Sequence, residues 1–97
     1  MGIEEILGRY RSDIRRIAAK HGVTRVRVYG NVARGNAGPE SEIDFLIHAG
    51  AKVSPWFPGG LKADLEQLLG HYVSILDEDD IRPPLPREHI LAEAVDL

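Results

Sequence analysis

The sequence has no cysteine, no long apolar run and no basic N-terminal segment. Without cysteine, a disulfide-stapled fold, a thiol nucleophile and a thiolate metal site are all excluded. No apolar stretch approaches the roughly 20 residues that cross a bilayer. The chain opens with Glu4 and Glu5 rather than with the positive charges of a secretory signal. We therefore expect a cytoplasmic protein with no membrane segment.

The length of 97 residues predicts one domain spanning residues 1–97, at the low end of what folds around a single core. An apolar fraction of 43% and a charged fraction of 28% are ordinary for a soluble globular protein. A chain this short buries limited surface, so a partner protein or a second copy of the chain could complete its core or its function.

The net charge of −3 conceals an uneven distribution. Residues 1–40 carry eight Lys or Arg against four acids, and residues 41–97 carry four against eleven. A basic half can attract nucleic acid or nucleotide phosphates. The simpler interpretation is that four arginines form the solvated face of the first helix: Arg9, Arg11, Arg15 and Arg16. Nucleic-acid binding is therefore not indicated.

Apolar residues at three- and four-residue steps predict an amphipathic helix over residues 2–20, ended by His21-Gly22. The same spacing predicts a helix over residues 61–69 and a last short helix over residues 87–95. One helical turn is expected at residues 31–34.

Alternating apolar residues predict strands over residues 25–29, 42–47 and 72–76. In the second, Ile43, Phe45 and Ile47 fall on one face of the strand. The fold class is therefore α/β (α+β), with helices packed on a small three-stranded mixed sheet.

Two features carry candidate chemistry. Gly30-Asn31 stands between a strand and a helical turn, where glycine lets the backbone approach a ligand and helix-start N–H groups point at anions. Glu42 and Asp44 are two residues apart, about 7 Å along a strand, so both could reach one cation or two neighbouring cations. Each feature alone is weak, because an acidic pair on a strand is usually a solvated face.

Their joint order is more specific: Tyr29-Gly30-Asn31-Val32-Ala33-Arg34-Gly35, a polar loop, then Ser41-Glu42-Ile43-Asp44-Phe45-Leu46. This order resembles the signature of the DNA polymerase beta-like nucleotidyltransferases, in their minimal, MntA-like branch. That branch has an aromatic-Gly-Ser-x-Ala-Arg-Gly segment followed by Ser-Asp-x-Asp-Leu. The resemblance covers nearly the whole chain.

The resemblance implies a role for each matching position. Gly30 and Asn31 would hold nucleotide phosphates, with Arg34 nearby. Glu42 and Asp44 would be catalytic metal ligands for Mg²⁺ (or Mn²⁺), aligning the triphosphate of an NTP. It also implies a partner, since many minimal nucleotidyltransferases act as antitoxins beside a HEPN-type helical protein.

The sequence departs from the family pattern at three positions. Asn31 replaces Ser, and its amide can still donate to a phosphate oxygen. Glu42 replaces Asp and adds one methylene, which disturbs the strict octahedral geometry of Mg²⁺. Ser74 replaces the third Asp, and a hydroxyl is neither an anionic ligand nor a base near neutral pH. The acidic run Asp77–Asp80 could substitute, although a solvated turn is the plainer interpretation.

The remaining polar and aromatic candidates are weaker. Four histidines show no ligand spacing and are expected at the surface or at helix ends: His21, His48, His71 and His89. Tyr29 fills the family's aromatic position, where a structural role is expected. Trp56 and Phe57 lie in a Pro/Gly loop and either anchor an interface or cover the edge of the core.

Three hypotheses follow. The first is a degenerate, non-catalytic member that acts as an antitoxin-like partner of a HEPN-type toxin and retains NTP binding. The second is an active or weakly active transferase that moves NMP from NTP to a partner protein. The third is a small α/β domain of unrelated function.

Overall fold

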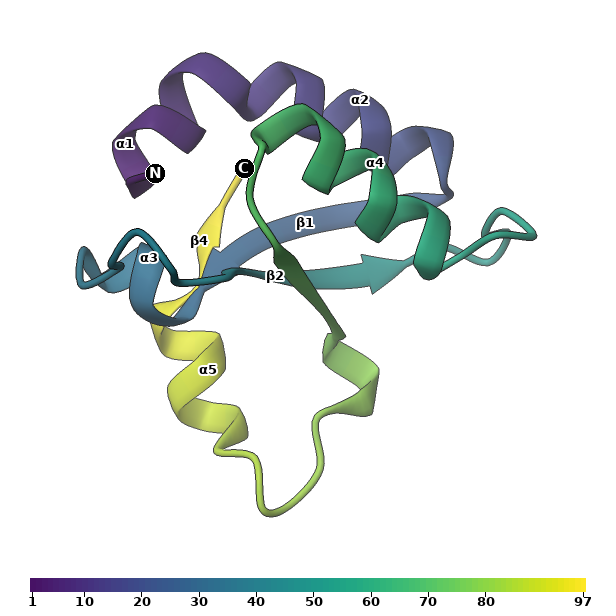
Figure 1. The fold of residues 1–97 in the computed structure, drawn as a ribbon. Helices are drawn as coiled ribbons and strands as arrows, with labels where there is room; N and C mark the ends of the chain where they lie inside the picture. The colour runs from purple at the N-terminus through teal and green to yellow at the C-terminus, as the bar shows by residue number, and fades with distance from the viewer.

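The computed structural model describes residues 1–97 as a four-stranded sheet with helices on both faces (Figure 1). The elements in chain order are α1 (Ile3–Glu5), a π-helical segment (Ile6–Tyr10), α2 (Arg11–Lys20), β1 (Val23–Tyr29), α3 (Gly30–Arg34), β2 (Ile43–Ala49), α4 (Gly59–Leu69), β3 (Val73–Asp77), a 3₁₀ turn (Glu78–Asp80), α5 (Arg87–Glu93) and β4 (Val95–Asp96). This is the mixed α+β class that the sequence predicts.

The sheet has the strand order β3-β2-β1-β4. β1 pairs antiparallel with both β2 and β4, and β2 pairs parallel with β3, so α4 is the crossover between the parallel strands. The expected count of three strands was wrong, because Val95 and Asp96 pair with Val28 and Arg27 instead of continuing the last helix. A pair of residues is too short to produce a periodic signal.

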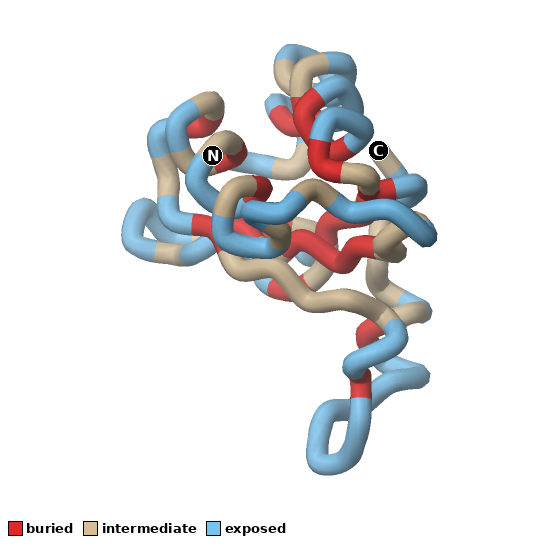
Figure 2. Tube along the Cα trace, turned by 90° about the vertical axis from the view of Figure 1, so that its right-hand side faces the viewer, coloured by how far each residue is buried: buried red, intermediate tan, exposed pale blue.

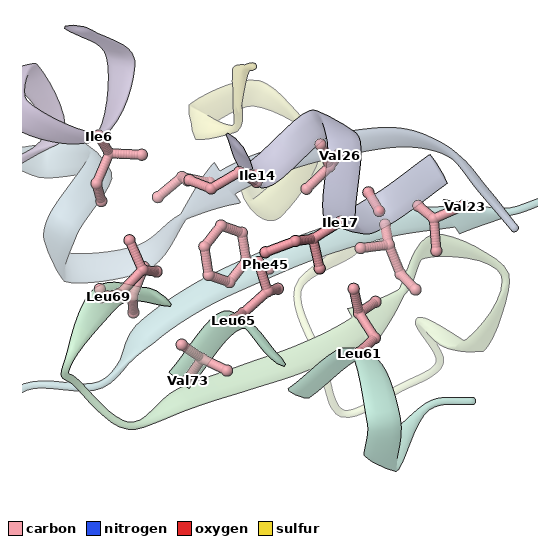
Figure 3. Packing of buried hydrophobic residues seen from close by; sticks show 14 of the residues in the cluster. Ile6, Ile14, Ile17, Val23, Val26, Phe45, Leu61, Leu65, Leu69 and Val73 are labelled. Atoms are coloured by element: carbon pink, nitrogen blue, oxygen red, sulfur yellow. The ribbon is translucent and has the colours of Figure 1, made fainter. Parts of the chain in front are cut away.

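One face of the sheet carries the main core, under α2 and α4 (Figures 1 and 3). Ile43, Phe45 and Ile47 all point into it and are at most 1% exposed, which confirms the face predicted from their spacing. Val26 and Val28 of β1 pair with Ile47 and Phe45 and join the same cluster. The helices contribute the opposing side chains: Ile14, Ile17, Leu61, Leu65 and Leu69.

The opposite face carries a small second cluster and the polar residues of interest. Leu46, Ile81 and Ile90 form this cluster, with Tyr29, Leu76, Leu91 and Ala94 packed against it. α5 lies on this side of the sheet (Figure 1), and the loop before it projects outward and is largely exposed (Figure 2). The three cluster residues are buried, and the residues packed against them are partly exposed.

The N-terminal helix differs from the uniform α-helix expected over residues 2–20. Residues 6–10 form a π turn, which holds an extra residue. Ile6 and Ile14 are eight residues apart, a spacing that a regular α-helix would turn by about 80°. The π turn removes much of this offset, and both side chains are fully buried. The four arginines of this segment are exposed, as expected.

His21 ends α2, which is one of the two positions expected for the histidines, and only 5% of the residue is exposed. Its Nδ1 lies 2.9 Å from Ser54 Oγ, and its Nε2 lies 2.7 Å from Asp64 Oδ2. The ring therefore joins α2, α4 and the loop after β2.

The two aromatic residues of the loop after β2, Trp56 and Phe57, differ in their exposure. Trp56 is 77% exposed and does not cover the core, whereas Phe57 packs against the main cluster. None of the helices has the length and apolar character needed to span a membrane.

Candidate nucleotide and metal site

Gly30 is the first residue of α3 and directly follows β1. It is buried and has a φ of +73°, in the left-handed region that favours glycine. A side chain at this position would also collide with the carboxylate of Asp44. Gly30 therefore lies in close contact with a carboxylate of β2, and its approach to a ligand stays a prediction.

Asp44 and Ser74 lie side by side on adjacent parallel strands. They are register partners of β2 and β3, and Ser74 Oγ donates a hydrogen bond of 2.5 Å to Asp44 Oδ1. The hydroxyl thus occupies the place beside Asp44 where the family pattern has a third carboxylate. A carboxylate here would set two negative charges against each other, whereas the hydroxyl satisfies one oxygen of Asp44.

Tyr29 joins this pair from β1, where it is the register partner of Asp44. Burial raises the pKa of the Tyr29 phenol above 10.0, and the negative charge of Asp44 raises it further, while Ser74 lowers it. The phenol is therefore neutral at neutral pH. Tyr29 also packs against the second cluster, in agreement with the structural role expected from the sequence.

Glu42 stands one residue before the start of β2 and is exposed. Its side chain makes no hydrogen bond or ion pair within the chain. The two predicted carboxylates are therefore in different states, since Asp44 is held by Ser74 and Glu42 is free to turn toward a ligand.

Arg34 and Asn31 meet on α3, and Arg34 also binds a carboxylate that sequence reasoning missed. Arg34 Nη2 donates to Asn31 Oδ1 at 2.6 Å, and Arg34 Nη1 donates to Glu93 Oε2 at 2.6 Å. Glu93 Oε1 accepts from the Gly30 N–H at 3.0 Å. Glu93 lies 63 residues from Gly30 in the sequence, and no local pattern links the two residues.

The charge state of Glu93 follows from these contacts. Burial would raise the pKa of the Glu93 carboxyl, but the hydrogen bonds from Arg34 and Gly30 outweigh this, and the pKa lies below its ordinary 4.5. Glu93 is therefore ionised at neutral pH. Two of the predicted phosphate-site residues, Gly30 and Arg34, thus bind an internal anion, and Asn31 binds Arg34.

The acidic run after β3 lies away from Asp44. Asp77 and Asp79 place carboxylate oxygens within 4.8 Å of His48, at the far end of β2. His48 is four residues beyond Asp44, about 13 Å along a strand. Asp77 therefore does not replace the carboxylate missing at Ser74, and the interpretation of the run as a turn is supported by the hydrogen bond from Asp79 N to Asp77 Oδ1.

Glu78 of the same run has a different partner. Its Oε2 accepts from Arg27 Nη2 at 2.5 Å, and its Oε1 lies 3.0 Å from His48 Nδ1. Arg27 is only 6% exposed, although it alternates along β1 with the core residues Val26 and Val28. This ion pair ties the end of β3 to the middle of β1.

The donors at the predicted metal site are hard oxygen atoms, which are the ligands that Mg²⁺ and Mn²⁺ take in proteins. Asp44 and Glu42 are the two carboxylates that could hold such an ion, and Ser74 supplies a neutral oxygen. Ser74 also borders a surface cavity of about 320 Å³, lined in addition by Pro58, Gly59, Lys62 and Ile75. The donor set fits a divalent cation in kind, with one negative charge fewer than the family pattern.

Comparisons with known proteins agree with this geometry. The nucleotidyltransferase domain family matches residues 11–97. A Methanocaldococcus jannaschii protein described as "Putative protein adenylyltransferase MJ0435" is 40% identical over 81 residues, which cover 84% of this chain and 86% of that protein. A solved structure described as a "putative minimal nucleotidyltransferase" superposes with a TM-score of 0.83 at 38% identity, covering 100% of this chain and 97% of the other.

More distant structures share the fold alone. A chain from a toxin–antitoxin crystal structure with AMP-PNP superposes with a TM-score of 0.73 at 15% identity, covering 90% of this chain and 71% of that one. A chain from the MntA-HepT toxin–antitoxin structure gives a TM-score of 0.62 at 15% identity, covering 88% and 66%. With a family match over most of its length and a relative 40% identical to it, the chain belongs to the nucleotidyltransferase family.

Proposed function

We propose that this chain is a nucleotidyltransferase-family protein that binds a nucleoside triphosphate and acts as an antitoxin-like partner of a HEPN-type toxin, with its transfer activity reduced or lost. The observation that carries the proposal is the 2.5 Å hydrogen bond from Ser74 to Asp44. Ser74 stands in register with Asp44, where the family pattern has its third carboxylate, so the substitution falls inside the site.

The chemical cost of Ser74 is large. Near neutral pH a serine hydroxyl does not accept a proton from an attacking nucleophile, and general-base assistance is typically worth about 10²–10⁴-fold in rate. A neutral oxygen also attracts a divalent cation less than a carboxylate does. A bound Mg²⁺ or Mn²⁺ would supply charge stabilisation to the triphosphate, and Asp44 and Glu42 are the residues that would hold it.

Nucleotide binding requires less of the site than catalysis. The Gly30 N–H and the Arg34 guanidinium are already aimed at an anionic group, the carboxylate of Glu93. Arginine and backbone N–H donors of this kind also bind phosphate oxygens. These donors support retained affinity for a triphosphate.

The proposed partner rests on kinship of fold. Two of the structural neighbours are chains of toxin–antitoxin complexes, one of them the MntA-HepT pair. The HEPN identity of the toxin comes from the family resemblance. Trp56, exposed at 77%, is available to a partner protein on this chain's surface.

A second candidate function is weak transfer of an adenylyl group to a protein. It is favoured by the 40% identical relative described as "Putative protein adenylyltransferase MJ0435". It is also favoured by the two remaining carboxylates, because Glu42 is unpaired and Asp44 is intact. Transfer would then proceed without the third carboxylate, at a correspondingly lower rate.

A label-transfer assay separates the two candidates. The chain is incubated with a HEPN-type protein from the same genome, α-labelled ATP, and Mg²⁺ or Mn²⁺. Our proposal predicts a complex on size-exclusion chromatography without label transfer, and label transfer by the Glu42→Asp, Ser74→Asp double variant.

The matched control is Asp80→Asn, which removes an exposed carboxylate elsewhere in the chain. Transfer by the native chain that Asp44→Asn abolishes and Asp80→Asn retains would establish the enzymatic candidate instead. Absence of any complex with the HEPN-type protein would contradict the antitoxin-like role.

A further inference from the structure

Glu93 fills the place between the donors of the candidate phosphate site. Its two carboxylate oxygens are both engaged, Oε1 by the Gly30 N–H at 3.0 Å and Oε2 by Arg34 Nη1 at 2.6 Å. His89, one turn earlier on α5, places Nε2 at 3.3 Å from Oε2. The Glu93 side chain is 13% exposed, so this contact is largely withdrawn from water.

A phosphate group would need the same donors. A carboxylate and a phosphate both offer two oxygens to an arginine and a backbone N–H, in geometries that overlap. The second terminal nitrogen of Arg34 is also hydrogen-bonded, because Arg34 Nη2 donates to Asn31 Oδ1. An incoming triphosphate therefore meets donors that are already satisfied.

We propose that Glu93 is an internal competitor for the nucleotide's phosphates and that it sets the nucleotide affinity of this site. The proposal rests on the proposed nucleotide binding. A triphosphate binds Gly30 and Arg34 only when the Glu93 carboxylate leaves them. The apparent affinity for the triphosphate is therefore the intrinsic affinity multiplied by the fraction of molecules in which Glu93 has left these donors.

The fold lets Glu93 leave without unfolding α5. Ile90 of the same helix is 5% exposed and packs with Leu46 and Ile81. Asp96, just beyond the helix, is bound by both Nε and Nη2 of Arg25. These anchors lie on both sides of Glu93, so α5 stays attached while the side chain turns away. Glu93 is also the last residue of α5, where a helix is easiest to loosen.

A positioning role for Glu93 makes the opposite prediction. If the carboxylate served to hold Arg34 and Gly30 in a binding geometry, its removal would weaken nucleotide binding. Competition predicts that its removal strengthens binding. The direction of the change in affinity therefore distinguishes the two roles.

The test is calorimetric titration of the native chain, Glu93→Gln and Glu88→Gln with ATP and, separately, with tripolyphosphate. Glu88 is the matched control, because it is an exposed glutamate of α5 whose side chain makes no hydrogen bond or ion pair within the chain. We expect Glu93→Gln to bind both compounds about tenfold more tightly, the order expected when a charge-assisted contact is lost from the competing state. Glu88→Gln should bind like the native chain.

Each other outcome has a definite meaning. Native binding with equal or weaker binding by Glu93→Gln overturns competition and leaves the proposed nucleotide binding intact. No binding by either chain overturns both proposals.

A measurement on the native chain covers the case in which Glu93→Gln does not fold. The ¹³C resonance of the Glu93 carboxyl is followed by NMR while ATP is added. Displacement predicts a shift toward the value of a solvated glutamate at saturation, and an unchanged resonance with ATP bound would refute competition.

Discussion

Ser74 donates a hydrogen bond of 2.5 Å to Asp44 across the parallel pair β2–β3. The hydroxyl satisfies one oxygen of the carboxylate and adds no second negative charge. A metal site built from close carboxylates needs a cation to offset their repulsion. With Ser74 in place, Asp44 faces no second carboxylate on β3, so no cation is needed to offset repulsion between them.

This relationship predicts how stability responds to metal. Ser74→Asp should lower the free energy of unfolding in EDTA by about 1 kcal/mol, because two carboxylates then face each other near the surface. Mg²⁺ should recover most of the loss, while the native chain is indifferent to it. Thermal unfolding of both chains in EDTA and in Mg²⁺ measures this, and a Ser74→Asp chain that Mg²⁺ does not stabilise would contradict the assignment of position 74 to the metal site.

The same pair predicts two opposite changes at Tyr29. Burial and the Asp44 charge raise the pKa of its phenol above 10.0, and Ser74 lowers it. Asp44→Asn should therefore lower the pKa of Tyr29, and Ser74→Ala should raise it. An NMR titration of ¹³C-tyrosine resonances reports each phenol separately, with exposed Tyr72 as an internal reference. If neither substitution changes the pKa of Tyr29, its phenol does not lie near Asp44 and Ser74.

Acid should loosen the attachments of the C-terminal half. Burial opposes ionisation of Glu93 and Glu78, yet their hydrogen bonds with Arg34 and Arg27 hold the pKa of each below 4.5. A carboxyl whose folded pKa is depressed stabilises the fold above its unfolded pKa and loses that contribution as pH falls through the folded pKa. Urea unfolding should therefore show stability falling below about pH 4.5, with a shallower fall for Glu93→Gln. An equal fall in stability for the native and Glu93→Gln chains would show that Glu93 does not contribute to the pH dependence.

His21 predicts a stability effect far from the site. Its buried ring is bonded to Ser54 and Asp64, so His21→Phe leaves both partners without this contact and should cost about 1–3 kcal/mol. Chemical denaturation measures the loss. His71→Phe is the control, because His71 makes no side-chain hydrogen bond. Equal stability of the two variants would show that the His21 contacts contribute nothing.

The sequence predicted local features well and distant contacts poorly. Val26, Val28, Ile43, Phe45 and Ile47 showed their strands and their buried face through alternation, a property of neighbouring residues. The burial of Arg27 depends on Glu78, 51 residues away, and the anion at Gly30 comes from Glu93, 63 residues away. Such pairs become neighbours only when the whole sheet forms, so no window of sequence contains them.

The family motif reached further than periodicity because it links positions whose neighbours are distant. It placed Ser74 at the third carboxylate position, and the structure puts Ser74 beside Asp44. It did not indicate Glu93, because Glu93 lies outside the segments that the motif covers. The ion pair of Arg27 with Glu78 and the two-residue strand β4 likewise match no sequence motif.

The central claim is that this site binds a triphosphate, and the loss of a carboxylate at Ser74 predicts that binding depends less on a metal ion than in a complete carboxylate set. It is tested most directly by the affinity for ATP in EDTA and in excess Mg²⁺, for the native chain and for Glu42→Asp, Ser74→Asp. We predict that Mg²⁺ changes the native affinity less than about threefold and tightens binding by the double variant about tenfold or more, since carboxylates and phosphates then share the ion. A native affinity that depends strongly on Mg²⁺, with the dependence abolished by Asp44→Asn, would contradict the account.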